Sequence, residues 1–167
     1  TTQQGKEDMF LAGKNRYAAD QSNFSKIPGS PVAYWVSEAI RNAFSYKSLE
    51  KVSLCCKGLD SGDNNRFLRF WFEPSYGSIS FDSATGMDIT WCPHNKGGAY
   101  RKWYGNLDYV IWWKNNGQDI RKHPGSRPQN IDNFFKQCLT WSTLSSGDVA
   151  FRALAEGCTS DSKGSIC

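Results

Sequence analysis

The chain has no long hydrophobic run. None of its segments approaches the roughly 20 consecutive apolar residues that cross a bilayer. Its first ten residues, TTQQGKEDMF, lack the apolar core of a secretory signal peptide. These two absences predict a soluble, cytoplasmic protein without a membrane segment.

Patterns typical of metal ligands are also scarce. The chain holds two histidines and six cysteines but no Cys-x-x-Cys, and Cys92-Pro93-His94 is too tight to match a zinc ligand pair. We therefore expect no metal site. We expect the cysteines to be reduced thiols, because a chain of this size needs no disulfide framework. One alternative stays open, a small thiol enzyme using Cys92 and His94.

What the chain does contain is enough apolar material for one domain. Hydrophobic residues make up 39% of its 167 residues and include seven tryptophans, which fits a globular fold with a real core. Residues 1–26 are polar and aperiodic, and are interpreted as an incoming linker. We assign 27–167 to one domain, truncated at its C-terminal end, because 161–167 has the character of an approach to another strand.

Local patterns predict two helices, several strands and a turn. Apolar residues recur at helical spacing over 32–44, after a capping Ser30, and again over 131–138; the aromatic residues of the first helix are expected in the core. The sequence Asn115-Asn116-Gly117 predicts a turn. Strand composition occurs over 49–54, 66–72 (expected to be covered on both faces), 78–81, 107–114, 139–144 and 149–154. Without regular alternation of strand and helix, these elements predict an α+β fold with a mixed or antiparallel sheet.

The most informative segment is the stretch 95–128. It holds seven basic residues and two acidic ones, a local net charge of +5, whereas the whole chain carries +4. Six tyrosines and tryptophans lie among these cations. Basic groups interleaved with aromatic rings are typical of nucleic-acid surfaces, so we expect one concentrated positive face. The alternative is a core strand flanked by solvated lysines.

Five motifs occur in an order that resembles one family. They are SPVAYWVS at 30–37, GDNNRFLRFW at 62–71, NKGGAYRKWYGN at 95–106, SRPQN at 126–130 and LTWS at 139–142. Together they are similar to the region downstream of the catalytic half in the large adenine-specific DNA methyltransferases of the BREX phage-exclusion system and in related type II restriction-system methylases. The likeness covers roughly residues 20–165.

This resemblance implies a DNA target-recognition domain, and the residues suit that role. The amides of Asn64 and Asn65 can bond adenine edges, while Arg66, Arg101 or Arg127 can grip guanine or phosphate. The remaining cations are expected to make phosphate contacts that do not read sequence: Lys96, Lys102, Lys114, Arg121 and Lys122. The alternatives are a plain capped turn for the asparagines and a solvated face for the cations at 101–102.

The chemistry of methyl transfer is missing. An adenine-methylating site needs an acidic or amide residue followed by two prolines and an aromatic residue, and the chain has no Pro-Pro dipeptide. It also lacks a glycine-rich turn suited to S-adenosylmethionine and a carboxylate cluster suited to a nuclease metal. The resemblance therefore implies a fragment that is inactive alone, with S-adenosylmethionine bound by the parent enzyme.

The expected partners are duplex DNA, the catalytic half of the parent chain and other phage-defence proteins, in a bacterial cytoplasm. The main alternative is a protein-interaction module that docks defence components through exposed aromatics such as Trp103 and Tyr104. A carbohydrate-binding domain is a further alternative, since tryptophans also stack on sugars, but the charge of 95–128 argues against it.

Overall fold

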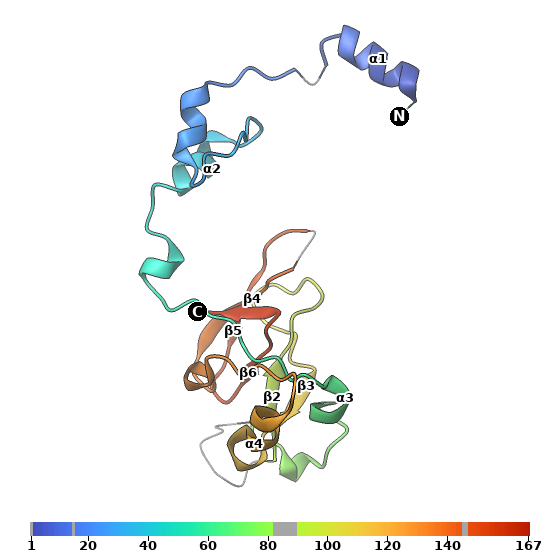
Figure 1. The fold of residues 1–167 in the computed structure, drawn as a ribbon, viewed down its shortest axis with the longest axis vertical. Coiled ribbons are helices and arrows are strands. Elements are labelled where there is room, and N and C mark those ends of the chain that lie inside the picture. The colour runs from blue at the N-terminus through green and yellow to red at the C-terminus, as the bar shows by residue number, and fades with distance from the viewer. Residues whose placement is uncertain (1, 15, 82–89, 145–146) are drawn as a thin grey trace. The chain divides into compact units, whose positions relative to one another are not determined.

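The computed structural model describes residues 2–14, 16–81, 90–144 and 147–167. The chain divides into two compact units, Thr1–Val52 (unit 1) and Ser53–Cys167 (unit 2) (Figure 1). The predicted boundary between residues 26 and 27 falls inside unit 1.

Unit 1 consists of short helices, each begun by a polar cap or turn. They are α1 (Gln3–Leu11), the 3-10 helix η1 (Gln21–Lys26), α2 (Glu38–Ala43) and the 3-10 helix η2 (Leu49–Lys51). The predicted helix at 32–44 is shorter than expected, because the Ser37 side chain accepts a hydrogen bond from the Ile40 N–H (3.4 Å) and starts the helix there. The aromatic core predicted for it is wrong, since Trp35 is 69% exposed. The predicted strand at 49–54 is also wrong, because η2 occupies its start.

Unit 2 contains two sheets. The four-stranded sheet has the order β1-β3-β2-β6, with β1 (Leu68–Phe70), β3 (Tyr109–Trp112) and β2 (Trp91–Asn95) antiparallel and β6 (Thr159–Ser160) parallel to β2. The three-stranded antiparallel sheet has the order β5-β4-β7. Its strands are β5 (Phe151–Leu154), β4 (Cys138–Ser142) and β7 (Gly164–Ile166). The α+β class with mixed and antiparallel sheets is therefore confirmed.

The helices of unit 2 are short. They are α3 (Asn64–Phe67), η3 (Tyr76–Ser78), α4 (Lys114–Lys122) and η4 (Ile131–Asn133). Figure 1 shows α4 toward one end of this unit and β4 and β5 toward the other. The predicted turn is confirmed at the start of α4, where Asn115, Asn116 and Gly117 all have positive φ.

The core of unit 2 lies under the four-stranded sheet. β3 carries Val110 and Ile111, which are 1% and 0% exposed, and Trp113 packs edge-to-face on Phe134 (ring centroids 5.9 Å apart). Ile111, Trp113 and Phe134 form one buried cluster with five further apolar residues: Leu59, Phe67, Leu68, Cys92 and Ile120.

Three other strands and helices predicted from local patterns differ in the structure. The range 66–72 begins as α3 and is a strand only in β1, and Phe72 is 66% exposed, so it is not covered on both faces. The range 78–81 forms one isolated bridge, Ile79 to Trp91, after η3. The range 131–138 holds the 3-10 helix η4 in place of an α-helix. The strands predicted near 107–114, 139–144 and 149–154 are confirmed as β3, β4 and β5.

Candidate functional site

The loop before α3 is built by its polar residues. Gly62 has φ +71, and a Cβ there would lie 2.6 Å from the Gly125 carbonyl carbon. Asp63 then caps α3 by accepting from the Arg66 N–H (3.1 Å). The loop is also fastened to the segment of Arg127, because the backbones of Asp60 and Arg127 exchange two hydrogen bonds (3.1 and 2.9 Å).

Arg69, in β1, lies next to this loop. One guanidinium nitrogen, Nη1, donates to the carbonyls of Asn65 and Leu68 (2.6 Å each). The guanidinium carbon lies 5.9 Å from the centroid of a Trp91 ring, within cation–π range. Within the described ranges Arg69 forms no ion pair with a carboxylate. The side chain is therefore held in place while its charge stays available for an anion.

Arg69 separates two adjoining hollows, which together we call the Arg69 cleft. One has a volume of about 410 Å³ and is lined by Asn64, Asn65, Leu68, Arg69, Phe70, Glu73, Lys96 and Tyr109. The other has a volume of about 270 Å³ and is lined by Arg66, Phe67, Arg69, Trp91, Trp112 and Asp119. The cleft thus combines three cations with aromatic rings, two asparagine amides and two carboxylates.

The cations of the cleft rest on aromatic rings. The Lys96 Nζ lies 5.3 Å from the Tyr109 ring centroid, and the Arg66 guanidinium carbon lies 5.0 Å from that of Phe67. One acid of the cleft is already engaged, since the Asp119 carboxylate accepts from Trp112 Nε1 (2.8 Å). The cleft can therefore bind an anion and, beside it, a flat ring.

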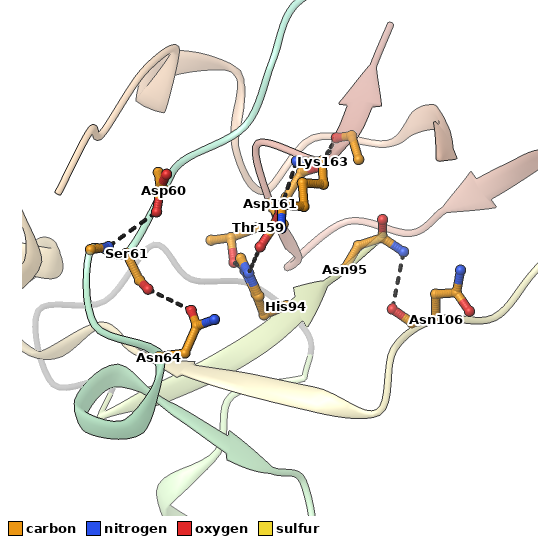
Figure 2. Close-up of polar contacts among 12 residues, drawn as sticks. Asp60, Ser61, Asn64, His94, Asn95, Asn106, Thr159, Asp161 and Lys163 are labelled. Atoms are coloured by element: carbon orange, nitrogen blue, oxygen red, sulfur yellow. Dashed lines mark hydrogen bonds and ion pairs between the residues drawn. The ribbon is translucent and has the colours of Figure 1, made fainter. Parts of the chain in front are cut away.

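The two asparagines of the loop are not equivalent. The Asn64 side-chain oxygen accepts from the hydroxyl of the buried Ser61 (2.7 Å), and Figure 2 shows this amide turned toward Ser61. The exposed Asn65 contributes its backbone carbonyl to Arg69. Of the two amides, that of Asn65 is therefore the freer one for a ligand.

A buried polar network behind β2 positions Lys96. The Asn95 amide donates to the carbonyls of Gly105 and Asn106 (3.3 and 3.2 Å) and accepts from the Thr140 hydroxyl (3.1 Å), which links the two sheets. The Lys96 N–H then donates to the Asn106 carbonyl (3.1 Å). This fixes the backbone from which the Lys96 side chain reaches the cleft.

His94 in the same strand is completely buried. Its Nδ1 forms a hydrogen bond with the Thr159 hydroxyl (2.8 Å), and its Nε2 lies 3.8 Å from Asp161 Oδ2, too far for a hydrogen bond (Figure 2). Burial lowers the pKa of His94. Burial acts to raise the pKa of Asp161, but His94 and the Lys163 N–H (2.7 Å) outweigh it, so that pKa is lowered. The His94 side chain has no access to solvent and that of Asp161 is 13% exposed, so the pair is a structural element.

The structure brings only some of the predicted site residues to the cleft. Four of them line it: Asn64, Asn65, Arg66 and Lys96. The side chains of Arg101 and Lys102 are exposed beside the other sheet, because Trp103 bridges to β5. Lys114, Arg121 and Lys122 are exposed on α4, toward the end of unit 2 away from β4 and β5 (Figure 1), and line neither hollow of the cleft, and Arg127 is exposed beside Asp60. The cations of 95–128 therefore do not form the one concentrated face that was expected.

Two arginines have roles that the sequence did not reveal. In the sequence Arg69 is one basic residue within the strand pattern of 66–72, whereas in the structure it lines both hollows of the cleft. Arg152 in β5 is 1% exposed and donates to the Arg101 carbonyl (3.2 Å) and the Ser142 hydroxyl (3.4 Å). The sequence signal available for both was a basic residue inside an otherwise apolar strand pattern.

The alternative of a thiol enzyme finds no support. Cys92 is 0% exposed, and burial raises the pKa of its thiol, which opposes formation of a nucleophilic thiolate. All six cysteines are free thiols. Among the described residues, no group of three or more His, Cys, Asp or Glu side chains is placed to hold a metal ion. Nor does any helix in those ranges have the length and apolar character to cross a membrane.

No protein-family model matches the chain. Over 181 aligned residues it is 38% identical to a Lacticaseibacillus casei (strain Zhang) protein named adenine-specific methyltransferase PglX, with 98% of this chain and 15% of that protein covered. Over 146 residues it is 38% identical to the adenine-specific methyltransferase BrxX of Escherichia coli O9:H4 (strain HS), with 87% of this chain and 12% of that protein covered. The chain thus spans less than a fifth of either relative's length. As a short segment, it belongs to the family of adenine-specific methyltransferases represented by PglX and BrxX, the family that its motifs indicated.

Proposed function

We propose that this chain is the DNA-recognition region of an adenine-specific DNA methyltransferase serving BREX-type phage defence. It binds duplex DNA through the Arg69 cleft and positions a target adenine for the catalytic part of the parent enzyme. The relatives carry the name of adenine-specific methyltransferases, which makes DNA the natural ligand.

The observation that carries the proposal is the composition of the cleft. Arg66, Arg69 and Lys96 come from α3, β1 and the end of β2, yet all three line adjoining hollows. Cations of this kind bind phosphates, and the exposed amide of Asn65 can bond a base edge. Arg69 is fixed by two carbonyls, so little side-chain entropy is lost when it binds a phosphate.

Methyl transfer itself is assigned to the part of the parent enzyme outside this chain. The chain has no Pro-Pro dipeptide with which to hold a flipped adenine. S-adenosylmethionine is therefore expected to bind elsewhere in the parent, and the partners of this chain are duplex DNA and the catalytic half, in the bacterial cytoplasm.

The salt dependence of DNA binding tests this proposal. The logarithm of the affinity for duplex DNA should fall linearly with the logarithm of salt concentration, with a slope of about −0.9 for each phosphate contacted. Lys96→Ala should weaken binding to all sequences alike and make the slope shallower by about one unit. Fluorescence anisotropy on labelled duplexes from low to moderate salt measures both effects.

The matched control is Lys122→Ala, a lysine of α4 that does not line the cleft. It should leave the slope unchanged. If Lys122→Ala changes the slope and Lys96→Ala does not, DNA binds at the cations of α4 outside the cleft and the cleft is the wrong interface. If no duplex binds, even with the chain fused to the catalytic half, DNA recognition by this region is refuted.

One observation favours a protein-interaction module as the second candidate. Trp103 and Tyr104 are 69% and 79% exposed, while the Trp103 backbone is fixed to Phe151 and Ala153 by two hydrogen bonds (2.9 Å each). Rigid exposed aromatics are typical of binding hot spots. Replacing both by alanine should abolish capture of a defence component while leaving DNA affinity intact if this candidate is right.

A further inference from the structure

Arg152 in β5 is a charged side chain that is buried without a carboxylate partner. It is 1% exposed, and within the described ranges it forms no ion pair. Its guanidinium has five N–H donors, and the bonds to the Arg101 carbonyl (3.2 Å) and the Ser142 hydroxyl (3.4 Å) occupy two of them. Its Nε has no hydrogen-bond partner among the described residues. Burial therefore leaves N–H donors unused and a positive charge unbalanced.

Such a group lowers the stability of the fold. A charge removed from water needs a counter-ion or a full set of hydrogen bonds, and Arg152 has neither. Burial lowers the pKa of Arg152, but an arginine stays protonated in proteins, so the charge is not lost. The next residue on the same face of β5 is Leu154, which is 2% exposed, so this face accepts an apolar side chain. The counter-charge for Arg152 is thus expected from a ligand.

Arg152 lines a small pocket with a volume of about 40 Å³, which we call the Arg152 pocket. Its lining also includes the polar side chains of Tyr100, Ser142 and Asp148 and the apolar ones of Val149 and Ala150. The Ser142 hydroxyl accepts from Arg152, so its own proton can be donated to a ligand. The pocket therefore offers N–H and O–H donors to an anion.

The volume of the pocket selects the anion. One water molecule needs about 10–15 Å³ of such volume, so the pocket holds about three water-sized groups. This matches the three heavy atoms of a carboxylate, whose two oxygens accept paired N–H bonds from an arginine. A phosphodiester has four oxygens on its phosphorus and continues as a chain on two sides, so a DNA backbone is too bulky to enter.

The mouth of the pocket favours an acidic protein segment. Tyr100 is 58% exposed there, and Arg101 and Lys102 beside it are exposed cations that attract acids. The chain spans less than a fifth of either relative's length, so most of the protein surface near it belongs to the parent enzyme. We propose that the Arg152 pocket binds the carboxylate of an aspartate or glutamate side chain from the part of the parent enzyme outside this chain. This docking goes beyond DNA recognition and does not depend on it.

Acetate, a free carboxylate, tests the chemistry of the pocket in the 167-residue chain. The ¹H–¹⁵N signal of the Arg152 Nε–H should shift and saturate as sodium acetate replaces sodium chloride at constant ionic strength. Asp148→Asn should lower the half-saturating concentration severalfold, because Asp148 lines the pocket without pairing with Arg152 and repels a second carboxylate. Arg127→Met is the matched control: it removes an exposed arginine that does not line the pocket, so the titration should be unchanged.

Hydrogen exchange tests the source of the carboxylate. Backbone amides of residues 98–104 should exchange more slowly in the parent enzyme than in the 167-residue chain, because the docked segment covers them. Arg152→Met in the parent should abolish this difference. The same variant of the 167-residue chain should keep the urea midpoint and the duplex affinity of the wild type, since an apolar side chain of similar size often replaces a buried charge without loss of stability.

The outcomes decide the proposal. An unmoved Nε–H signal with a lower urea midpoint for Arg152→Met makes the guanidinium a structural donor and overturns it. A signal that moves with inorganic phosphate but not with acetate, together with weaker duplex binding by Arg152→Met, overturns it in favour of a DNA phosphate. Loss of stability in Asp148→Asn shows that Asp148 is the counter-ion in solution and overturns it as well. An acetate shift with equal exchange in the chain and the parent overturns the parent enzyme as the source. An acetate shift with protection in the parent that Arg152→Met removes supports the proposal.

Discussion

At the scale of single residues, the site depends on polar side chains buried behind it. Asn95 satisfies its amide completely and connects the loop at 105–106 with β4, so its burial costs little despite its polarity. His94 is different, because its Nε2 has no hydrogen-bond partner and faces the Asp161 carboxylate at 3.8 Å. Burial of this ring outweighs the nearby carboxylate and favours the neutral form of His94 in the folded chain.

The lowered pKa of His94 predicts a pH dependence of stability. The folded pKa of His94 is lowered from its ordinary value of 6.5, so below pH 6.5 the unfolded chain takes up a proton that the folded chain does not. The free energy of unfolding should then fall with decreasing pH, by up to about 1.4 kcal/mol per pH unit from this group. Asp161 has the same effect at lower pH. Because its folded pKa is lowered, its carboxylate contributes stability above pH 3.8, the ordinary pKa of the group, and this stability is lost as the pH falls through the folded pKa.

Urea unfolding followed by tryptophan fluorescence between pH 7.5 and 5.5 measures this slope. His94→Gln is expected to be less stable at every pH but to show a flatter dependence, since the titrating group is gone. A variant with the full wild-type slope would contradict the assignment to His94.

Sequence patterns located the loop of the site but not the whole cleft. The Gly62-Asp63-Asn64-Asn65 motif is local, because a positive φ, a cap and a short helix all fall within six consecutive residues. The cleft is not local. Trp91, Trp112 and Asp119 reach Arg69 only because β2 pairs with β3 and α4 follows it, which no spacing in the sequence reveals.

At the scale of elements, periodicity predicted strands better than helices. β3, β4 and β5 lie where β-branched and aromatic residues cluster, because such side chains pack well against those of neighbouring strands. Of the range 32–44, which has apolar residues at helical spacing, only α2 is helical, because the Ser37 cap starts the helix later than predicted. The apolar face of this segment is exposed in unit 1. At the start of β5 burial runs against hydropathy, since Arg152 is buried and Phe151 is 41% exposed.

The segment before α3 packs closely against β6, and a substitution can test this close packing. A Cβ on Gly58 would lie 1.9 Å from the Ser160 carbonyl oxygen, and the adjacent Leu59 N–H donates to that same oxygen (2.8 Å). Gly58→Ala should therefore destabilise the chain by about 1–3 kcal/mol, because backbone must move. Gly77→Ala is the control: a Cβ there meets nothing within 4 Å, so its urea midpoint should match the wild type. Equal midpoints for both variants would show that the two segments are farther apart.

At the scale of the whole molecule, the Arg69 cleft and the core belong to one unit. All residues of the buried cluster and of the Arg69 cleft lie within Ser53–Cys167. Among the described residues of unit 1, the buried apolar side chains are Ile27 and Ala33. The composition of the chain predicted one core but not the residue at which its domain begins. Composition alone does not distinguish a polar linker from a helical unit with exposed apolar residues, such as unit 1.

This division predicts that residues 53–167 fold and bind DNA without unit 1. The shortened chain should unfold in one cooperative transition with the urea midpoint of the tryptophan signal unchanged, because the midpoint depends on interactions that it retains. Its duplex affinity and salt slope should equal those of the full chain, since the cations of the cleft are all present. Residues 1–52 alone should show no cooperative transition, for lack of a core. A lower midpoint for 53–167 would mean that unit 1 stabilises unit 2, and a lost salt slope with an unchanged midpoint would mean that unit 1 itself contributes phosphate contacts.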